Sequence, residues 1–232
     1  MITNSEIKEI RALREKKFRD ELGLFVVEGE KMVREALMSN FEVVRVWRKE
    51  EIGDAAMERI STLSTPPPVL AVVSKPKPAG FRLERGLYLA LDSVRDPGNM
   101  GTIIRLADWF GISTVFASPD CVEVWNPKVI QASMGSIFRV RVVNSDVPDI
   151  CKRFKLNDMK VFGTFLDGSN IYEQDIEKEG LIVMGNESNG ISPEVEAEVN
   201  SRLFIPSYGG SKAESLNVAV ATAVTLAEFR RR

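Results

Sequence analysis

The second half of the chain alternates short apolar runs, rich in β-branched residues, with segments of helical periodicity. The runs that follow residue 86 are LYLALD, TVFAS, FRVRVV, KVFGTFL, LIVMG and RLFIP. Runs that are apolar on both faces are typical of buried parallel strands, because helices must then cover both sides of the sheet. We therefore predict an α/β fold with a mostly parallel sheet in this part of the chain.

A break in this pattern at residues 74–86, SKPKPAGFRLERG, predicts a domain boundary near residue 80. Before the break we expect a charged helix over about residues 5–18. The further elements expected there are the strand LFVVEG, the helix EKMVREALM, the strand VVRVW, a helix around AAMERISTL and the strand VLAVV. Residues 1–80 are thus predicted to form a small α/β domain, and residues 81–232 a larger one.

The composition removes several kinds of catalytic site. The 232 residues include no histidine, which excludes Ser-His triads and removes the commonest metal ligand, so we expect no metal site. Cys121 and Cys151 form no CxxC pattern, as is typical of structural thiols in a reducing compartment. The charged N-terminus does not resemble a signal peptide, and no apolar run approaches the roughly 20 residues of a membrane span. We expect a cytoplasmic protein without a membrane segment.

The strand LYLALD leads into the turn DPGNMG, residues 96–101, and then into the helical stretch GTIIRLADWFG. Ligands bind at such strand ends in α/β folds. The turn has only Gly98 and Gly101 of a dinucleotide fingerprint, although Asp120, about 20 residues further on, is placed like a ribose-binding acid. A nicotinamide-dependent oxidoreductase therefore stays open, as does a plain turn with Arg105 as a solvated helix charge.

Two later stretches carry the same kind of turn. In LIVMGNESNGIS, Glu187 lies between Gly185 and Gly190, ahead of a helix cap at Ser192 and Pro193. In residues 202–229 we expect a strand, a glycine-rich loop and a helix opened by Ser215, Leu216 and Asn217. Structural roles stay open for three polar residues, namely turn capping for Glu187, helix capping for Ser215 and a left-handed turn position for Asn99.

Together these stretches resemble the TrmH/SpoU branch of the SPOUT RNA methyltransferases. The first motif is matched by DPGNMGTIIRLADWFG with Asn99 and Arg105, the second by GNESNG with Glu187, and the third by IPSYGGSKAESLNVAVA with Ser215 and Asn217. The stretch NPKVIQASMGSIFRV is also similar, although many members carry an arginine in place of Gln131. The stretch FVVEGEKMVREAL looks like the ribosomal-protein-like RNA-binding domain that precedes the catalytic domain in many members.

The resemblance implies a trefoil-knotted domain that binds S-adenosylmethionine, a homodimer, and methyl transfer to a ribose 2′-hydroxyl of ribosomal or transfer RNA. By position, the residues implied to bind the cofactor are Gly185, Ile205, Leu216 and Thr164. Those implied to act in catalysis are Arg105, Asn99, Glu187, Ser215 and Asn217. In this arrangement Arg105 reaches toward the methyl-donor pocket from one subunit or the other.

Because a guanidinium group stays protonated, we expect Arg105 to grip a substrate phosphate and stabilise charge on the attacking oxygen. Asn99 and Asn217 would orient Arg105 or the ribose, and Glu187 and Ser215 would fix the loops. Methyl transfer needs positioning and a dry pocket rather than a metal or a covalent nucleophile, so a chain without histidine can perform it. A non-catalytic RNA-binding homologue stays open as an alternative.

RNA affinity has to come from local charge, because the formal net charge of the chain is -2. Residues 1–80 contain 14 Lys and Arg against 13 Asp and Glu, so this domain is nearly neutral. Basic residues nevertheless gather near the start of the chain. We therefore predict that Arg11, Arg14 and Lys16 contact RNA.

Overall fold

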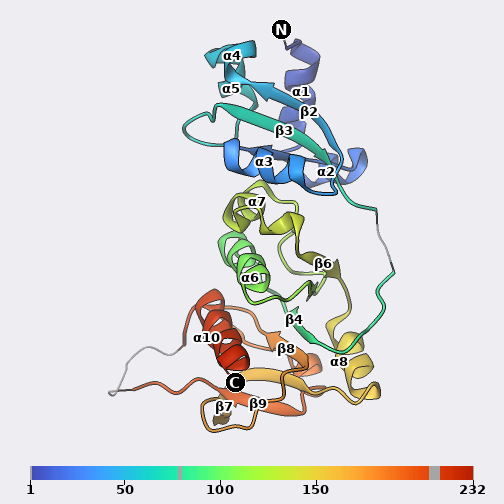
Figure 1. The fold of residues 1–232 in the computed structure, drawn as a ribbon, viewed down its shortest axis with the longest axis vertical. Coiled ribbons are helices and arrows are strands. Elements are labelled where there is room, and N and C mark those ends of the chain that lie inside the picture. The colour runs from blue at the N-terminus through green and yellow to red at the C-terminus, as the bar shows by residue number, and fades with distance from the viewer. Residues whose placement is uncertain (1, 78–79, 209–214, 232) are drawn as a thin grey trace.

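The computed structural model describes residues 2–77, 80–208 and 215–231. It places two α/β units one above the other along the longest axis of the molecule, with the N-terminal unit at the top of Figure 1. The upper sheet has the antiparallel order β1-β3-β2. Its strands are β1 (Leu24–Glu28), β2 (Val43–Arg48) and β3 (Val69–Ser74), and its helices are α1 (Asn4–Ala12), α2 (Lys16–Leu22), α3 (Glu30–Met38), α4 (Lys49–Ile52) and α5 (Asp54–Ile60).

The expected single helix over residues 5–18 is wrong, because the chain forms two helices with a break at residues 13–15. The break is explained by Arg19, whose Nη1 donates hydrogen bonds to the carbonyls of Leu13 and Arg14, each at 2.8 Å. A continuous helix would have used these carbonyl oxygens for its own backbone bonds. Arg19 is 2% exposed, so its buried guanidinium needs these hydrogen bonds, and they outweigh the helical preference of residues 13–15.

The lower unit contains the predicted parallel sheet, with the strand order β6-β5-β4-β8-β7-β9 and parallel pairing throughout. Its strands are β4 (Leu87–Leu91), β5 (Thr114–Ala117), β6 (Arg141–Asn144), β7 (Val161–Asn170), β8 (Gly180–Met184) and β9 (Ser201–Phe204). Its helices are α6 (Pro97–Trp109), α7 (Pro127–Ser133), the 3-10 turn η1 (Ser136–Phe138), α8 (Val147–Leu156), α9 (Pro193–Glu196) and α10 (Val218–Arg231).

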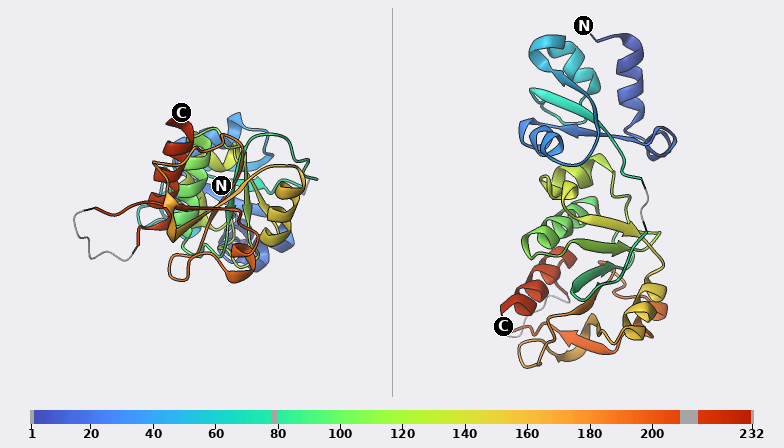
Figure 2. Two further views of the ribbon diagram at one scale, coloured as in Figure 1. Left: turned by 90° about the horizontal axis from the view of Figure 1, so that it is seen from below. Right: turned by 45° about the vertical axis from the view of Figure 1, so that its right-hand side comes forward.

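Helices cover both faces of this sheet, as the apolar strands require. Helices α6 and α10 lie on one face and α8 on the other, and α7 lies between α6 and the upper unit (Figure 1, Figure 2). Neighbouring residues of β4 alternate between the two layers. Leu89 packs in the cluster that contains Ile103 of α6, whereas Ala90 packs in the cluster that contains Phe154 of α8.

Two predicted elements have shifted boundaries. FRVRVV is not one strand, because Phe138 ends η1 and β6 begins only at Arg141. The ring centroid of Phe138 lies 5.2 Å from that of Phe41 in the upper unit. Phe138 thus packs against the upper unit rather than extending strand β6. The last helix begins at Val218 rather than at Ser215. The trefoil knot stays a prediction, since residues 209–214, which lead into this helix, lie outside the described part of the chain.

The two units share an apolar core. Phe25 of β1 is fully buried, and its ring centroid lies 4.7 Å from that of Trp125 in the lower unit. Arg19 also forms an ion pair with Glu123 across the boundary, where the two side chains are 3% and 14% exposed. The upper unit is therefore held in a fixed position on the lower one. In the part of the chain that is described, no helix is long and apolar enough to cross a membrane.

Candidate functional site

A cavity of about 570 Å³ lies beyond the carboxyl ends of β8 and β9 and beside the middle of β7. All four residues predicted to bind the cofactor line it, namely Thr164, Gly185, Ile205 and Leu216. Glu187 and Ser215 line it as well. Three parts of the chain that are far apart in the sequence form this cavity, namely the middle of β7, the turn after β8 and the segments flanking residues 209–214. Its size is typical of small-molecule sites.

The first motif begins a helix, for reasons that can be read from its residues. The side chain of Asp96 accepts a hydrogen bond from the backbone N–H of Asn99 at 2.7 Å, and Pro97 occupies the first helical position. Asn99 therefore lies in the first turn of α6, and the left-handed turn position considered for it is wrong. Gly101 lets α6 approach α7, since a Cβ there would lie 2.5 Å from that of Ala132.

A chain of hydrogen bonds connects the three motifs. Asn217 Nδ2 donates to Asn99 Oδ1 at 2.9 Å, and Asn99 Nδ2 donates to Glu187 Oε1 at 3.0 Å. The N–H of Asp96 also points to Glu187 Oε1, at 3.4 Å. Both amide groups thus have defined orientations, because each must accept on one side and donate on the other. The predicted residues Asn99, Glu187 and Asn217 form one polar unit beside the cavity.

Asn217 also explains where the last helix begins. Its Oδ1 accepts hydrogen bonds from the N–H groups of Ala219 at 3.0 Å and Val220 at 3.3 Å, which is the pattern of an N-cap. The helix cap that was considered for Ser215 is therefore made by Asn217, and Ser215 lies in the segment before the helix, where it lines the cavity. One asparagine side chain thus caps α10 with its oxygen and holds Asn99 with its nitrogen.

The turn after β8 is closed by its own backbone. The N–H of Asn186 donates to the carbonyl of Gly190 at 2.8 Å, and the reverse bond is 3.0 Å long. The side-chain oxygen of Asn186 accepts from the N–H groups of Ser188 and Asn189. A Cβ at Gly185 would lie 2.2 Å from the carbonyl carbon of Gly190, so only glycine fits there. Sequence reasoning missed Asn186, although an asparagine directly before the motif glutamate is a signal of such a turn.

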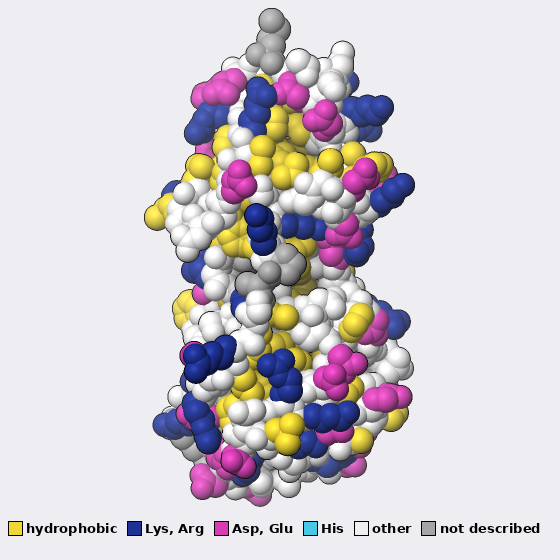
Figure 3. All heavy atoms as spheres, turned by 90° about the vertical axis from the view of Figure 1, so that its right-hand side faces the viewer, with side chains coloured by type: hydrophobic (Ala, Val, Ile, Leu, Met, Phe, Trp, Pro, Cys, Tyr) yellow, Lys and Arg dark blue, Asp and Glu magenta, His cyan; other side chains and the backbone are white. Residues whose placement is uncertain are grey.

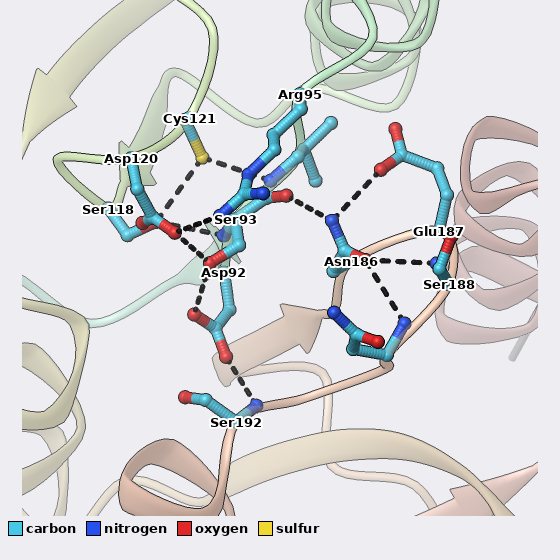
Figure 4. Close-up of polar contacts among 12 residues, drawn as sticks. Asp92, Ser93, Arg95, Ser118, Asp120, Cys121, Asn186, Glu187, Ser188 and Ser192 are labelled. Atoms are coloured by element: carbon cyan, nitrogen blue, oxygen red, sulfur yellow. Dashed lines mark hydrogen bonds and ion pairs between the residues drawn. The ribbon is translucent and has the colours of Figure 1, made fainter.

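Polar residues beside this turn form a second cluster, also missed from the sequence (Figure 4). Ser93 lies between Asp120 on one side and Asn186 on the other. Hydrogen bonds from the hydroxyls of Ser93 and then Ser118 hold the pKa of Asp120 below its usual value. Asp120 thus faces Ser93, Ser118 and Arg95 and is absent from the cavity lining, which does not fit the ribose-binding role considered for it.

Arg105 is separated from the other predicted catalytic residues. It lies on the exposed side of α6 and does not line the cavity. Its side chain makes no hydrogen bond or ion pair with the described residues. One turn further along this helix, the side chain of Trp109 is 82% exposed. The fold therefore brings Glu187 and Ser215 to the cavity, connects Asn99 and Asn217 to Glu187 by hydrogen bonds, and directs Arg105 to the outer surface.

The cavity wall carries negative charge. Glu187 and Glu196 both line it. Arg202 forms an ion pair with Glu196, and its guanidinium lies 3.6 Å from the ring centroid of Phe165, another lining residue. Arg202 is thus in a position to fix one wall of the cavity. Sequence reasoning missed it because its partners come from two other elements.

The three predicted RNA contacts differ in their surroundings. Arg14 donates to the carbonyl of Ser61, and Lys16 forms an ion pair with Asp20, whose hydrogen bond raises the pKa of Lys16. Arg11 is exposed on α1, and its side chain makes no hydrogen bond or ion pair with the described residues. Arg11 is therefore the freest of the three to meet a phosphate.

The two thiols are sequestered from reaction. Cys151 is fully buried, and this burial raises its pKa to about 12. Burial also raises the pKa of Cys121, whose Sγ donates to the carbonyl of Leu91. Neither thiol is a candidate nucleophile. Within the described ranges, no three Cys, Asp or Glu side chains are grouped so that they could hold a metal ion.

Two family descriptions match the chain. Residues 86–227 match the SpoU rRNA Methylase family, and residues 4–72 match the MRM3-like substrate binding domain. These ranges correspond to the lower and upper units of the fold.

Curated and solved relatives match over nearly the whole chain. It is 30% identical to the 23S rRNA (guanosine(2553)-2'-O)-methyltransferase of Bacillus subtilis, over 98% of this chain and 96% of that protein. A TrmH-family protein of Porphyromonas gingivalis has a TM-score of 0.90 and 40% identity, over 100% of this chain and 99% of that one. An AdoMet-bound rRNA methyltransferase of Sinorhizobium meliloti has a TM-score of 0.87 and 31% identity, over 100% and 96% of the two chains.

Proposed function

Because the chain belongs to the SpoU rRNA Methylase family, we propose that it transfers a methyl group from S-adenosylmethionine to a ribose 2′-hydroxyl of ribosomal RNA. The activity of an S-adenosylmethionine-dependent RNA ribose methyltransferase follows from this membership and from the named relatives. The observation that carries the proposal is the hydrogen-bonded chain Asn217, Asn99 and Glu187 beside the cavity. The nicotinamide alternative does not account for this combination of family, cavity and network. A non-catalytic homologue would lack donor binding or the motif arginine, whereas this chain has the cavity and keeps Arg105.

The cavity fits S-adenosylmethionine in its shape and in its chemistry. The missing side chain of Gly185 lets the turn close against the backbone of Gly190, and Leu216 and Ile191 supply apolar walls. Glu187 would offset the positive charge of a sulfonium ion, whereas Glu196 is already paired with Arg202. When bound, S-adenosylmethionine supplies an electrophilic methyl group on sulfur. We infer that Gly185, Ile205, Leu216 and Thr164 hold it, as the family motifs imply.

The chain's own residues position the ribose and stabilise charge. Asn99 has its amide fixed by Glu187 and Asn217, so it is a rigid polar group beside the cavity. Arg105 is proposed to grip a phosphate of the RNA and to stabilise the charge that develops on the attacking 2′-oxygen. Ser215 lines the cavity and is proposed to fix the segment before α10.

We propose a homodimer in which α6 and α10 of two chains face each other. The outer side of these two helices carries exposed apolar residues, among them Trp109 at 82% and Val220 at 49%. Arg105 lies on the same side of α6 as Trp109, four residues before it, and away from its own cavity. A two-fold dimer on this face would bring Arg105 toward the cavity of the partner.

The dimer can be tested with Trp109→Glu, which places a charge in the centre of the proposed interface. We expect the dimer dissociation constant to rise at least about tenfold, because a buried aromatic side chain is a typical hot spot. Analytical ultracentrifugation over a range of concentrations measures this. The matched control is Leu156→Glu on α8, a residue that is 84% exposed on the opposite face of the sheet. Equal self-association of the two variants would contradict the proposed interface.

The division into residues 1–80 for RNA binding and residues 81–232 for catalysis is part of the proposal. It is supported by the match of residues 4–72 to a substrate binding domain. Figure 3 shows Lys and Arg side chains interspersed with Asp and Glu over one face of the molecule, without a large patch of one sign. We infer that individual contacts, with Arg11, Arg14 and Lys16 as candidates, carry RNA affinity. The ribosomal substrate named for the Bacillus relative supports a cytoplasmic location.

Arg11→Glu should weaken RNA binding without changing the affinity for S-adenosylmethionine. The loss of one phosphate contact should also lower the salt dependence of RNA binding by about one unit in slope. Fluorescence anisotropy with labelled RNA at several salt concentrations measures both effects. Lys178→Glu is the control, because Lys178 is exposed in the loop before β8. The assignment of Arg11 fails if the two variants lose the same affinity.

The proposed activity has a direct test. Calorimetry should show binding of S-adenosylmethionine and no binding of NAD. Mapping of 2′-O-methylation across total RNA, from cells with and without the protein, should show a ribosomal nucleotide whose methylation depends on it. Methylation confined to transfer RNA would overturn the substrate, and binding of NAD alone would overturn the reaction.

A further inference from the structure

The backbone of Ser93 is held in an unusual conformation next to the first motif. Ser93 has a φ of 60°, in the left-handed region that residues with side chains seldom adopt. It follows the buried Asp92 at the end of β4 and precedes the turn that carries Asn99. A strained residue beside a functional site persists only where its surroundings fix it, and such positions often serve the function.

Both backbone polar groups of Ser93 and its hydroxyl are occupied (Figure 4). Its N–H donates to Ser118 Oγ at 2.8 Å, and its hydroxyl donates to Asp120 Oδ2. Asp120 also accepts from Ser118 Oγ at 2.7 Å, which orients that hydroxyl. Asp120 therefore holds Ser93 directly through its hydroxyl and indirectly through Ser118.

On the other side, the carbonyl of Ser93 accepts a hydrogen bond from Asn186 Nδ2 at 2.7 Å. This fixes the amide of Asn186 with its oxygen toward the N–H groups of Ser188 and Asn189. The same Nδ2 lies 3.3 Å from Glu187 Oε2. Ser93 thus holds the side chain of Asn186 within the turn that carries Glu187 and lines the cavity.

The loop that carries Asp120 also holds the substrate-binding unit. Three residues after Asp120, Glu123 forms ion pairs with Arg19 of α2 and Lys75 after β3. Two residues later the ring of Trp125 packs against Phe25. Residues 118–126, which connect β5 to α7 and are called the β5–α7 loop below, therefore contact the upper unit at one end and the turn of Ser93 at the other.

We propose that Asp120 is a positioning residue for methyl transfer, acting through Ser93 and Asn186 on the turn of Glu187. In this arrangement the β5–α7 loop holds this turn in a fixed position relative to the substrate-binding unit. The inference rests on the proposed function. Asp120 touches neither the cavity nor the predicted catalytic residues, so its effect is on the geometry of Glu187 and Asn99 rather than on a reacting atom.

The test compares Asp120→Ala with Asp120→Asn in single-turnover transfer of labelled methyl to RNA. We expect Asp120→Ala to lower the transfer rate on the order of tenfold, since a small displacement of positioned groups is costly. The dissociation constants for S-adenosylmethionine and RNA should stay within about twofold. Asp120→Asn keeps one oxygen that can accept the hydroxyl of Ser93 but replaces the acceptor of Ser118 Oγ by an NH2 group, so it should restore part of the rate although it also removes the charge opposite Arg95.

The control variant is Asp149→Ala, which removes an exposed, ion-paired aspartate of α8 in the same unit. Its transfer rate and melting temperature should match those of the wild type. The positioning role is overturned if Asp120→Ala transfers methyl groups at the wild-type rate, if its loss lies in cofactor affinity, or if Asp120→Asn is equally impaired. A wild-type protein without transfer activity would instead overturn the proposed function, so the two failures are distinguishable.

Discussion

Replacing Arg105 by alanine should lower methyl transfer by at least about a hundredfold, the scale for the loss of one charge-stabilising group. The dissociation constant for S-adenosylmethionine should stay nearly unchanged, because Arg105 does not line the cavity of its own chain. Calorimetry measures the dissociation constant for S-adenosylmethionine, and single-turnover transfer of labelled methyl to RNA measures the rate.

Arg105→Lys separates charge from geometry at the same position. A lysine keeps the positive charge but lacks the planar fork that binds a phosphate through two parallel hydrogen bonds. We therefore expect Arg105→Lys to restore little activity. Near-normal turnover of Arg105→Ala would show that the residue is a solvated helix charge, and a complete loss of cofactor binding would show that it belongs to the cavity.

Replacing Gly185 by valine should abolish detectable binding of S-adenosylmethionine and, with it, all methyl transfer. A Cβ at this position would lie 2.2 Å from the carbonyl carbon and 2.5 Å from the carbonyl oxygen of Gly190. Because these contacts are to backbone, the turn itself has to move, and affinity should fall at least about a hundredfold. Gly80→Val is the control, since nothing lies within 4 Å of a Cβ there. Calorimetry compares the two, and wild-type affinity in Gly185→Val would exclude the turn from the cofactor site.

The two inactive variants together show which chain supplies Arg105. In a mixed dimer of Arg105→Ala and Gly185→Val, one cavity is intact, and it faces the intact Arg105 of the other chain if the arginine acts across the interface. Co-expression of the two chains should then recover transfer that neither variant has alone. If Arg105 acts within its own chain, neither site of the mixed dimer is complete, and the mixture stays inactive.

Local features of the sequence were sufficient for much of the fold. The parallel sheet follows from apolar runs of strand length. The turn predicted over residues 96–101 is instead the first turn of α6, although a cap at Asp96 and a proline at position 97 are local signals of a helix start. The cofactor candidates Thr164, Gly185, Ile205 and Leu216, which the family resemblance implies, line one cavity. The composition, without histidine, already excluded the commonest general base.

Contacts between distant segments were decided only by the tertiary structure. The bond from Asn217 to Asn99 spans 118 residues, and the position of Ser93 depends on a loop 25 to 27 residues away and on Asn186, 93 residues away. Arg19 breaks a helix that its sequence favours, because its buried guanidinium needs the carbonyls of Leu13 and Arg14. Periodicity and turn chemistry describe a residue's own neighbourhood, whereas the partner of a buried polar group is set by packing, which no local pattern contains.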